Sequence, residues 1–188
     1  MGEPKRTLWT IGHSTLALEA FISLLRAHRI ETLADVRLLP GSRRFPHFNS
    51  EVLASSLSQA GIEYKHFREL GGRRKPRPDS KNTAWRNESF RGYADYMETP
   101  EFQRAAEELT ACAACSRTAV MCAEAVWWQC HRALISDWMK VRGVEVLHIL
   151  SENKVEPHPF TSAATVTDGQ LSYLAPRAGA TTAELPLT

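Results

Sequence analysis

The residues best equipped for chemistry lie in one short segment, residues 121–132, which reads MCAEAVWWQCHR. An apolar run at residues 118–121 precedes this segment and a helical pattern follows it, so it occupies a strand-to-helix junction. Open α/β sheets bind their ligands at such junctions. The segment holds thiol, carboxylate, imidazole and guanidinium groups, which serve as nucleophiles, acid–base groups, metal ligands and anion-binding groups. They belong to Cys122, Cys130, Glu124, His131 and Arg132.

The elements that must position this segment alternate between strand and helix. Strands are predicted at residues 7–11, 32–39, 62–67, 118–121 and 144–150. Helices are predicted from Leu18 onward, where Ser14 or Thr15 would be the cap, and at residues 52–60, 90–97, 101–114 and 127–141. This alternation predicts an α/β domain of three layers, with a mostly parallel sheet of about five strands and helices on both faces.

Length and composition set the domain organisation. The chain has 188 residues, 43% of them hydrophobic and 23% charged, which is ordinary for a globular protein. We expect a single α/β domain at residues 1–150. Residues 151–188 are expected to form a C-terminal extension, weakly structured or carrying an edge hairpin around Asp168 and Gly169. The sequence does not determine the oligomeric state.

The chain shows no sign of a membrane or export segment. No run of about 18 apolar residues is present, and the polar residues 1–6 lead into a strand rather than a signal-peptide core. We therefore expect a cytoplasmic protein without a membrane partner. Its four cysteines would then be free thiols or metal ligands.

Polar residues follow the ends of several predicted strands, and parallel strands end at one edge of a sheet. We therefore expect these residues to line one cleft, with His13, Asp35, Cys122, Glu124 and His131 as catalytic residues. Glu124 and His131 would move protons, Asp35 would orient His13 or bind substrate, and Cys122 would be a nucleophile or a metal ligand. Each also has a structural alternative: an Asp35–Arg37 ion pair, a core histidine or a buried thiol.

An anionic substrate is expected because basic residues surround this edge. Residues 65–92 carry nine basic and three acidic side chains, a net charge of +6, whereas the whole chain carries only +2. Aromatic residues interleave with these charges and could stack on nucleic-acid bases. Arg37, Arg43 and Arg132 are expected to hold the anion. The other expected substrate-binding residues are Ser14, Ser42, Gly71, Gly72 and Tyr93.

Four cysteines raise the question of a zinc site. Cys112 and Cys115 form a CxxC pair, but Cys115 precedes a predicted strand that Cys122 ends. About five residues at roughly 3.3 Å each separate them, so the four thiols cannot share one ion. Cys130 shares an apolar stripe with later helix residues and is predicted to be a core thiol. A smaller site of Cys122, Cys130, His131 and His13 stays open, and no metal or other cofactor is assigned.

Several motifs together resemble a known family, Domain of Unknown Function 488. They are residues 10–14 (TIGHS), 35–37 (DVR), 70–72 (LGG), 122–124 (CAE) and 130–132 (CHR). The resemblance covers roughly residues 7–149 and implies an α/β fold. It implies no settled activity, although some members carry DNA-repair labels.

The sequence thus predicts a small cytoplasmic enzyme, a hydrolase or transferase, acting on an anionic substrate that resembles a nucleotide or nucleic acid. One alternative is a non-catalytic nucleic-acid-binding module that uses the basic loop at residues 65–92. Another is a metal-dependent enzyme with cysteine and histidine ligands.

Overall fold

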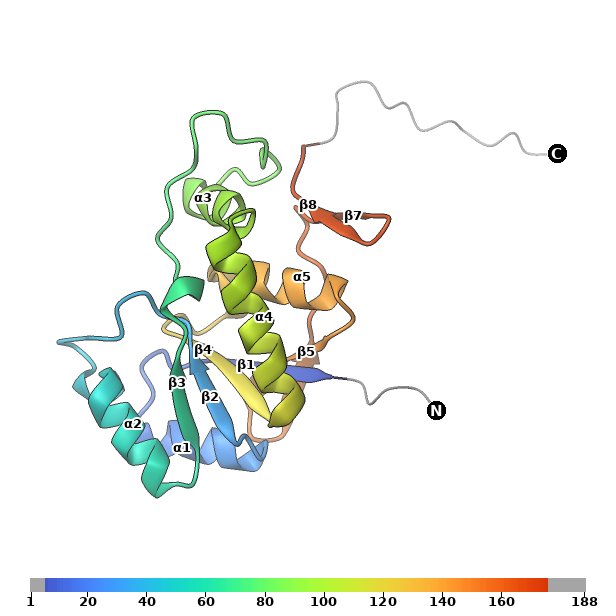
Figure 1. The fold of residues 1–188 in the computed structure, drawn as a ribbon. Helices are drawn as coiled ribbons and strands as arrows, with labels where there is room; N and C mark the ends of the chain where they lie inside the picture. The colour runs from blue at the N-terminus through green and yellow to red at the C-terminus, as the bar shows by residue number, and fades with distance from the viewer. Residues whose placement is uncertain (1–5, 176–188) are drawn as a thin grey trace, which may run out of the picture.

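The computed structural model describes residues 6–175, and its centre is a six-stranded sheet (Figure 1). The strand order is β3-β2-β4-β1-β5-β6, and all neighbours are parallel except β6, which pairs antiparallel with β5. The expected mostly parallel α/β sheet is confirmed, with one more strand than predicted. The strands are β1 (Thr7–Gly12), β2 (Thr32–Asp35), β3 (Glu63–His66), β4 (Thr118–Cys122), β5 (Glu145–Ser151) and β6 (Lys154–Pro157).

Helices cover both faces of the sheet, giving the expected three layers (Figure 1). Alternate strand residues point to opposite faces, so Trp9 and Leu33 enter one core and Leu8 and Ala34 enter the other. The first core is closed by α1 (Leu18–Ala27) and α2 (Ser50–Gln59). The second is closed by α3 (Glu88–Met97), α4 (Pro100–Cys115) and α5 (Arg132–Val141).

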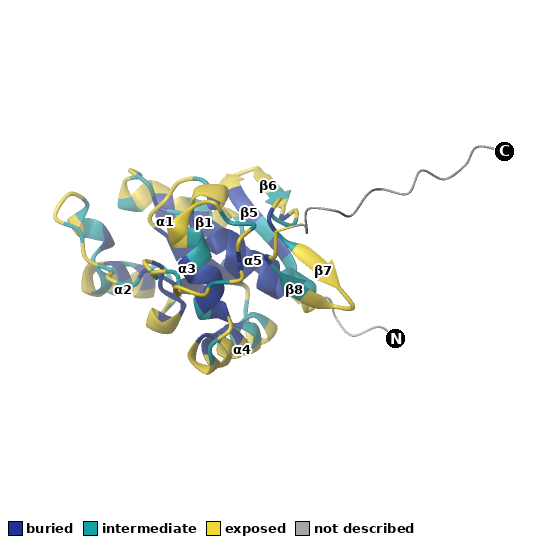
Figure 2. Cartoon of the chain, turned by 90° about the horizontal axis from the view of Figure 1, so that it is seen from above, coloured by how far each residue is buried: buried dark blue, intermediate teal, exposed yellow. Residues whose placement is uncertain are grey.

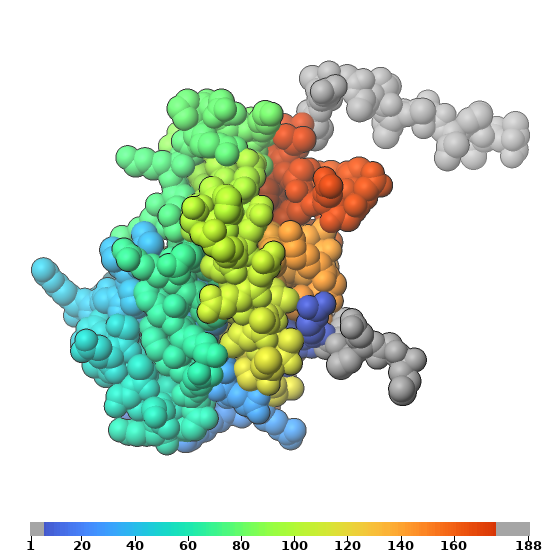
Figure 3. Space-filling view, viewed as in Figure 1, coloured from blue at the N-terminus to red at the C-terminus, as the bar shows by residue number. Residues whose placement is uncertain are grey.

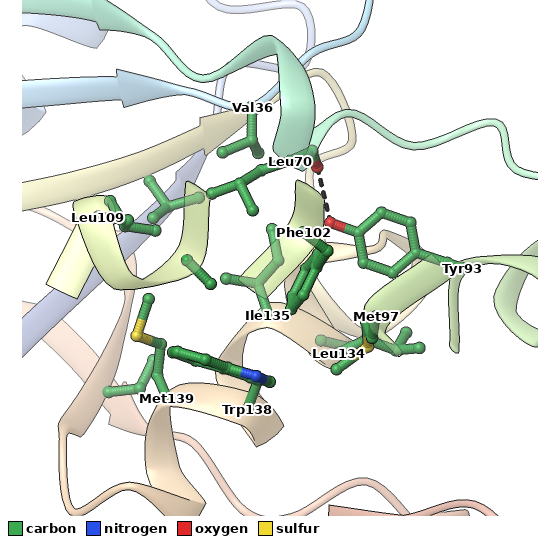
Figure 4. Packing of buried hydrophobic residues seen from close by; sticks show 14 of the residues in the cluster. Val36, Leu70, Tyr93, Met97, Phe102, Leu109, Leu134, Ile135, Trp138 and Met139 are labelled. Atoms are coloured by element: carbon green, nitrogen blue, oxygen red, sulfur yellow. Dashed lines mark hydrogen bonds between the residues drawn. The ribbon is translucent and has the colours of Figure 1, made fainter. Parts of the chain in front are cut away.

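The second core anchors the start of the long loop between β3 and α3. Figure 4 shows its aromatic and aliphatic side chains packed between α3, α4 and α5, with the Tyr93 hydroxyl donating to the Leu70 carbonyl. That bond is 2.7 Å long and both residues are buried. Leu70 ends a short 3₁₀ helix, η2 (Arg68–Leu70). The start of the loop is therefore attached to the helical layer.

Local backbone chemistry explains where the helices begin. The Asn87 side chain accepts hydrogen bonds from the first turn of α3, and Thr99 does the same for α4, which has Pro100 in its first turn. The expected cap of α1 is wrong: α1 begins after Ala17 without a side-chain cap. Ser14 instead lies in a turn with φ 46° and donates its N–H to the Ala123 carbonyl.

Two predicted elements are shorter than expected, and both differences affect the site. The second strand ends at Asp35 rather than Leu39, since bends and irregular chain follow it. The helix predicted from Trp127 begins only at Arg132, and Trp127–Gln129 form a separate 3₁₀ turn, η3. The remaining short element, η1 (Pro46–Phe48), precedes α2.

The segment after β5 is built onto α5. The Asp137 carboxylate, fully buried, accepts hydrogen bonds from His158, Thr161 and Tyr173. The predicted hairpin is present as β7 (Thr165–Thr167) and β8 (Gln170–Ser172), with positive φ at Asp168 and Gly169 as a tight turn requires. It forms its own two-stranded sheet, and Figure 2 shows β7 exposed.

The rest of the predicted extension, residues 176–188, lies outside the described residues. Within residues 6–175, the structure has no helix that is both long and apolar enough to cross a membrane.

Candidate active site

The carboxyl ends of β1, β2 and β4 bring the sequence motifs together. Gly12 is the register partner of Cys122, and Asp35 is that of Met121. Beyond these pairs, the His13 N–H donates to the Cys122 carbonyl at 3.0 Å, and the Val36 N–H donates to the Met121 carbonyl at 3.0 Å. The three motifs therefore lie side by side at one sheet edge, the position that the parallel topology predicts for a ligand site.

A cavity of about 760 Å³ opens at this edge, within the range of small-molecule sites. Most expected site residues line it: His13, Ser14, Arg37, Ser42, Gly72, Tyr93, Cys122, Glu124 and His131. Four expected residues are not among its walls: Asp35, Arg43, Gly71 and Arg132. The prediction of site residues missed several lining residues, including Arg44, Phe45, Arg73, Phe90, Gln129 and Cys130.

One wall of the cavity is a thiol–imidazole cluster. The His131 Nδ1 atom lies 3.6 Å from the Cys130 sulfur and 4.0 Å from the Cys122 sulfur. The other ring nitrogen, Nε2, lies 3.0 Å from the Val36 carbonyl and is assigned as the donor to it. Nδ1 therefore presents a lone pair to both sulfurs.

Gly72 allows this arrangement, because a Cβ atom at this position would lie 2.9 Å from Nδ1. Gly72 belongs to the LGG motif at residues 70–72, so this motif contains the position that makes room for the imidazole.

Each of the two thiols shifts the pKa of the other. Burial opposes ionisation of Cys130, but a hydrogen bond from Cys122, helped by His131 and Arg132, lowers its pKa well below the ordinary value. The same hydrogen bond, followed by burial, raises the pKa of Cys122. The two thiols therefore titrate as a coupled pair rather than independently. Cys130 is buried in the second hydrophobic core, as predicted, and its sulfur also faces His131.

Arg132 does not have the position expected of an anion-binding residue. Its side chain is 2% exposed, and its Nη2 donates to the carbonyls of Glu124 and Ala125 at 2.6 and 3.4 Å. Its Nε has no hydrogen-bond partner among the residues that the structure describes. Arg132 therefore fixes the backbone of the loop that carries Glu124, and its charge lies beside the thiols.

Asp35 and Arg37 form an ion pair, which is the predicted alternative to a catalytic role for Asp35. Asp35, fully buried, accepts from the Arg37 main-chain N–H and Nε and from the Tyr64 hydroxyl. Arg37 also donates to the Phe48 carbonyl at 2.8 Å. Asp35 is thus a positioning residue, and Arg37 reaches the cavity wall with most of its donors already used.

His13 is held neutral at the cavity wall. Burial, followed by the charge of Arg37, lowers its pKa from 6.5 to about 4. Its ring stacks on Phe48 at 4.1 Å, its Nδ1 lies 3.0 Å from the Ser14 carbonyl, and its Nε2 lies 3.4 Å from Arg37. Both ring nitrogens of His13 therefore have a neighbour within the protein, and the Arg37 charge disfavours protonation of the ring.

Among residues 6–175, Glu124 is the only carboxylate on the cavity wall, and it is exposed. Among residues 6–175 its carboxylate has no ion-pair or hydrogen-bond partner. Its carbonyl packs so closely against β1 that a Cβ at Gly12 would lie 1.9 Å from it. The backbone of Glu124 is therefore fixed while its carboxylate is free to reach a bound molecule.

The comparisons with known proteins identify the family. The family model described as domain of unknown function DUF488 matches residues 17–139, about two-thirds of the chain. This chain belongs to the DUF488 family. The match includes the residues of the thiol–imidazole cluster and begins just after the His13 turn. No curated protein and no solved structure matches the chain.

The basic loop of this DUF488 protein is structured rather than open. Asp95 of α3, 3% exposed, accepts from the Arg77 main chain, the Ser80 hydroxyl and the Asn82 amide. Arg74 stacks on Tyr96 at 3.7 Å. The loop lies at one end of the molecule, near the β7–β8 hairpin (Figure 3).

Part of the loop's charge and part of its aromatic surface are therefore used internally. Arg77 pairs with Glu98, and Arg91 donates to the Trp85 carbonyl. Phe67 and Tyr93 are buried, which removes two of the rings expected to stack on bases. Cations that stay exposed include Arg73 on the cavity wall and Lys75.

Proposed function

We propose that this DUF488 protein is an enzyme that performs hydrolysis or group transfer on an anionic substrate resembling a nucleotide or nucleic acid. The observation that carries the proposal is the meeting of two thiols, an imidazole and a free carboxylate on the wall of one cavity. Reactive groups gathered in a concave site are the usual mark of catalysis. A surface built only for binding has no need of a buried, hydrogen-bonded thiol pair.

The charge of the cavity wall favours an anion. Arg37, Arg44 and Arg73 line it, whereas Glu124 is the one carboxylate that the described part of the chain contributes, and His13 is neutral. Arg44 and Arg73 are exposed and can turn toward a bound phosphate or carboxylate. Arg37 is held by Asp35, so it supplies a fixed positive charge rather than a mobile clamp.

The aromatic lining supports a substrate with a flat ring. Phe45 and Phe90, both partly exposed, line the same cavity as the arginines. Rings beside guanidinium groups can bind a base and its phosphate together. This combination favours a nucleotide or a nucleotide unit of a nucleic acid over a small inorganic anion.

Glu124 is the proposed proton-transfer group. Its carboxylate is exposed at the cavity, while its backbone is held by Arg132 and packed on Gly12. A carboxylate on a fixed backbone can take a proton from an attacking group or give one to a leaving group. The cluster of Cys122, Cys130 and His131 is the proposed centre at which the attacking group is generated.

The experiment is a turnover screen followed by matched variants. The purified full chain is tested with nucleotides, phosphodiesters and short DNA and RNA oligonucleotides, including oligonucleotides with abasic sites. Glu124→Gln and Cys130→Ser are each expected to lower kcat/KM at least about 100-fold, the size typical of acid–base groups. Glu152→Gln, the same change at an exposed turn between β5 and β6, is the control and should keep full activity.

The outcome that contradicts the proposal is also defined. Full turnover in both Glu124→Gln and Cys130→Ser would show that these cavity residues take no part in catalysis. Salt-dependent binding of oligonucleotides with no turnover of any substrate would favour the binding-module alternative.

A further inference from the structure

We propose that Cys122, Cys130 and His131 bind one divalent cation of the zinc class, with a fourth coordination position open to the cavity. Within residues 6–175 these three side chains form the one histidine, cysteine and carboxylate group whose ligand atoms come close enough for shared coordination. The catalytic consequence of this site rests on the proposed function, but cation binding itself does not.

The distances between the ligand atoms fit tetrahedral coordination. Zinc–sulfur bonds of about 2.3 Å and a zinc–nitrogen bond of about 2.0–2.1 Å place a sulfur about 3.6 Å from the nitrogen. The His131 Nδ1 lies 3.6 Å from the Cys130 sulfur and 4.0 Å from the Cys122 sulfur. All three ligand atoms lie within 4.8 Å of one another. Both nitrogen–sulfur distances therefore lie within about 0.4 Å of the value that one zinc ion requires.

The imidazole is already oriented as a ligand. A metal-binding histidine commonly donates its second ring nitrogen to a carbonyl or carboxylate, which fixes the tautomer and the ring. His131 makes this contact with the Val36 carbonyl at 3.0 Å. Tyr93 packs on the ring at 5.0 Å and Gly72 leaves room for Nδ1. The lone pair is thereby directed at both sulfurs before any cation binds.

Charge balance favours thiolates at this position. Arg132 is buried beside the thiols, and within the described chain no carboxylate pairs with it. A bound divalent cation would replace the protons that the two sulfurs carry, and the two thiolates would then balance its charge. Thiolate and imidazole ligands favour zinc over magnesium or calcium.

The other candidate ligands lie elsewhere. Within the described residues, His13 is not part of the cluster, and its Nδ1 lies against the Ser14 carbonyl. Cys112 and Cys115 are at the end of α4, next to the amino end of β4, whereas Cys122 is at its carboxyl end. Three protein ligands with an open fourth position are the arrangement of catalytic zinc sites, in which a bound water loses a proton near pH 7.

The test is cobalt and zinc titration of the full chain, reduced and freed of metal. We expect one equivalent of Co²⁺ to release protons from the thiols and to give tetrahedral visible bands and a thiolate charge-transfer band, and Zn²⁺ then to displace it without further proton release. Cys122→Ser, Cys130→Ser and His131→Asn should each weaken binding at least about 100-fold, more than loss of a second-shell partner costs. Cys115→Ser, an exposed cysteine outside the cluster, is the matched control and should bind normally.

Folding is checked by circular dichroism, and a second readout is thermal unfolding with and without zinc. Zinc should raise the Tm of the wild-type protein and of Cys115→Ser but not that of Cys130→Ser. Absence of a one-equivalent complex in the folded wild-type protein would overturn the inference, as would binding that disappears only with Cys115→Ser.

The same experiment separates this inference from the proposed function. Stoichiometric binding without turnover of any substrate would support the cation site and contradict the proposed enzymatic activity. Turnover that persists after complete metal removal would support the enzymatic activity and overturn the catalytic role of the cation.

Discussion

Replacing Asp35 with asparagine should destabilise the protein strongly, because its carboxylate is the counter-charge of a buried guanidinium. Asp35 is fully buried and accepts from three donors of Arg37 and from the Tyr64 hydroxyl. Arg37 is only 7% exposed and would keep its charge. Breaking a buried pair by removing one partner costs about 3–5 kcal/mol. At roughly 2–4 °C per kcal/mol for a domain of this size, Tm should fall by about 6–20 °C.

Urea unfolding of Asp35→Asn gives the free energy directly, with Glu124→Gln as the control. Glu124 is exposed without an ion-pair partner among the described residues, so its change should stay within about 0.5 kcal/mol. Combining Asp35→Asn with Arg37→Met should recover part of the loss, since the double variant no longer buries an unpaired charge. A loss below about 1 kcal/mol in Asp35→Asn would refute this reasoning and return Asp35 to the candidates for catalysis.

Three further predictions test other parts of the structure. His13 and His148 have folded pKa values lowered by burial to about 4 and about 2, so only the unfolded state gains their protons as pH falls below 6.5. Stability should therefore be lost on acidification, approaching about 1.4 kcal/mol per pH unit for each histidine, and equal free energies of unfolding at pH 7 and 5 would contradict this. If polyanions reach the cavity from the loop, Arg73→Glu with Lys75→Glu should flatten the salt dependence of oligonucleotide binding by about 0.7–0.9 per lost phosphate contact, measured by fluorescence anisotropy. Asp137→Asn should accelerate hydrogen exchange of residues 158–173 while the β1 amides stay protected, and an unchanged exchange pattern would show that the carboxylate does not hold this segment.

The sheet was predictable from sequence because its signals are local. Apolar runs alternating with amphipathic segments specify a parallel sheet, and parallel strands must end at one edge. Asp168 and Gly169 specified a hairpin because both adopt positive φ. The gathering of His13 and Cys122 at one edge followed from the same topology.

Side-chain direction was not predictable in the same way. The helix predicted from Trp127 begins at Arg132, so Cys130 lies before α5, where it is buried in the second core and also contacts His131. Arg132 follows a pattern typical of an anion clamp, yet its side chain folds back onto the Glu124 carbonyl. The adjacency of Cys130 and His131 in the sequence was the available signal for their contact.

The positions of the remaining site residues depend on long-range contacts. Arg44 and Arg73 come from loops after β2 and after η2, and only the folded chain places both on one cavity wall. The buried network that anchors residues 158–173 joins α5 to side chains more than 20 positions later. No periodic pattern records such pairings, because they depend on how the elements pack.

The most direct test of the central claim is a crystal structure of the full chain soaked with a nucleoside monophosphate. The account predicts that the phosphate lies in the cavity between Arg44 and Arg73, with its phosphorus facing the Cys122–Cys130–His131 cluster and Glu124 within hydrogen-bond reach. A phosphate bound to the exposed side of the basic loop, with the cavity filled only by water, would contradict it.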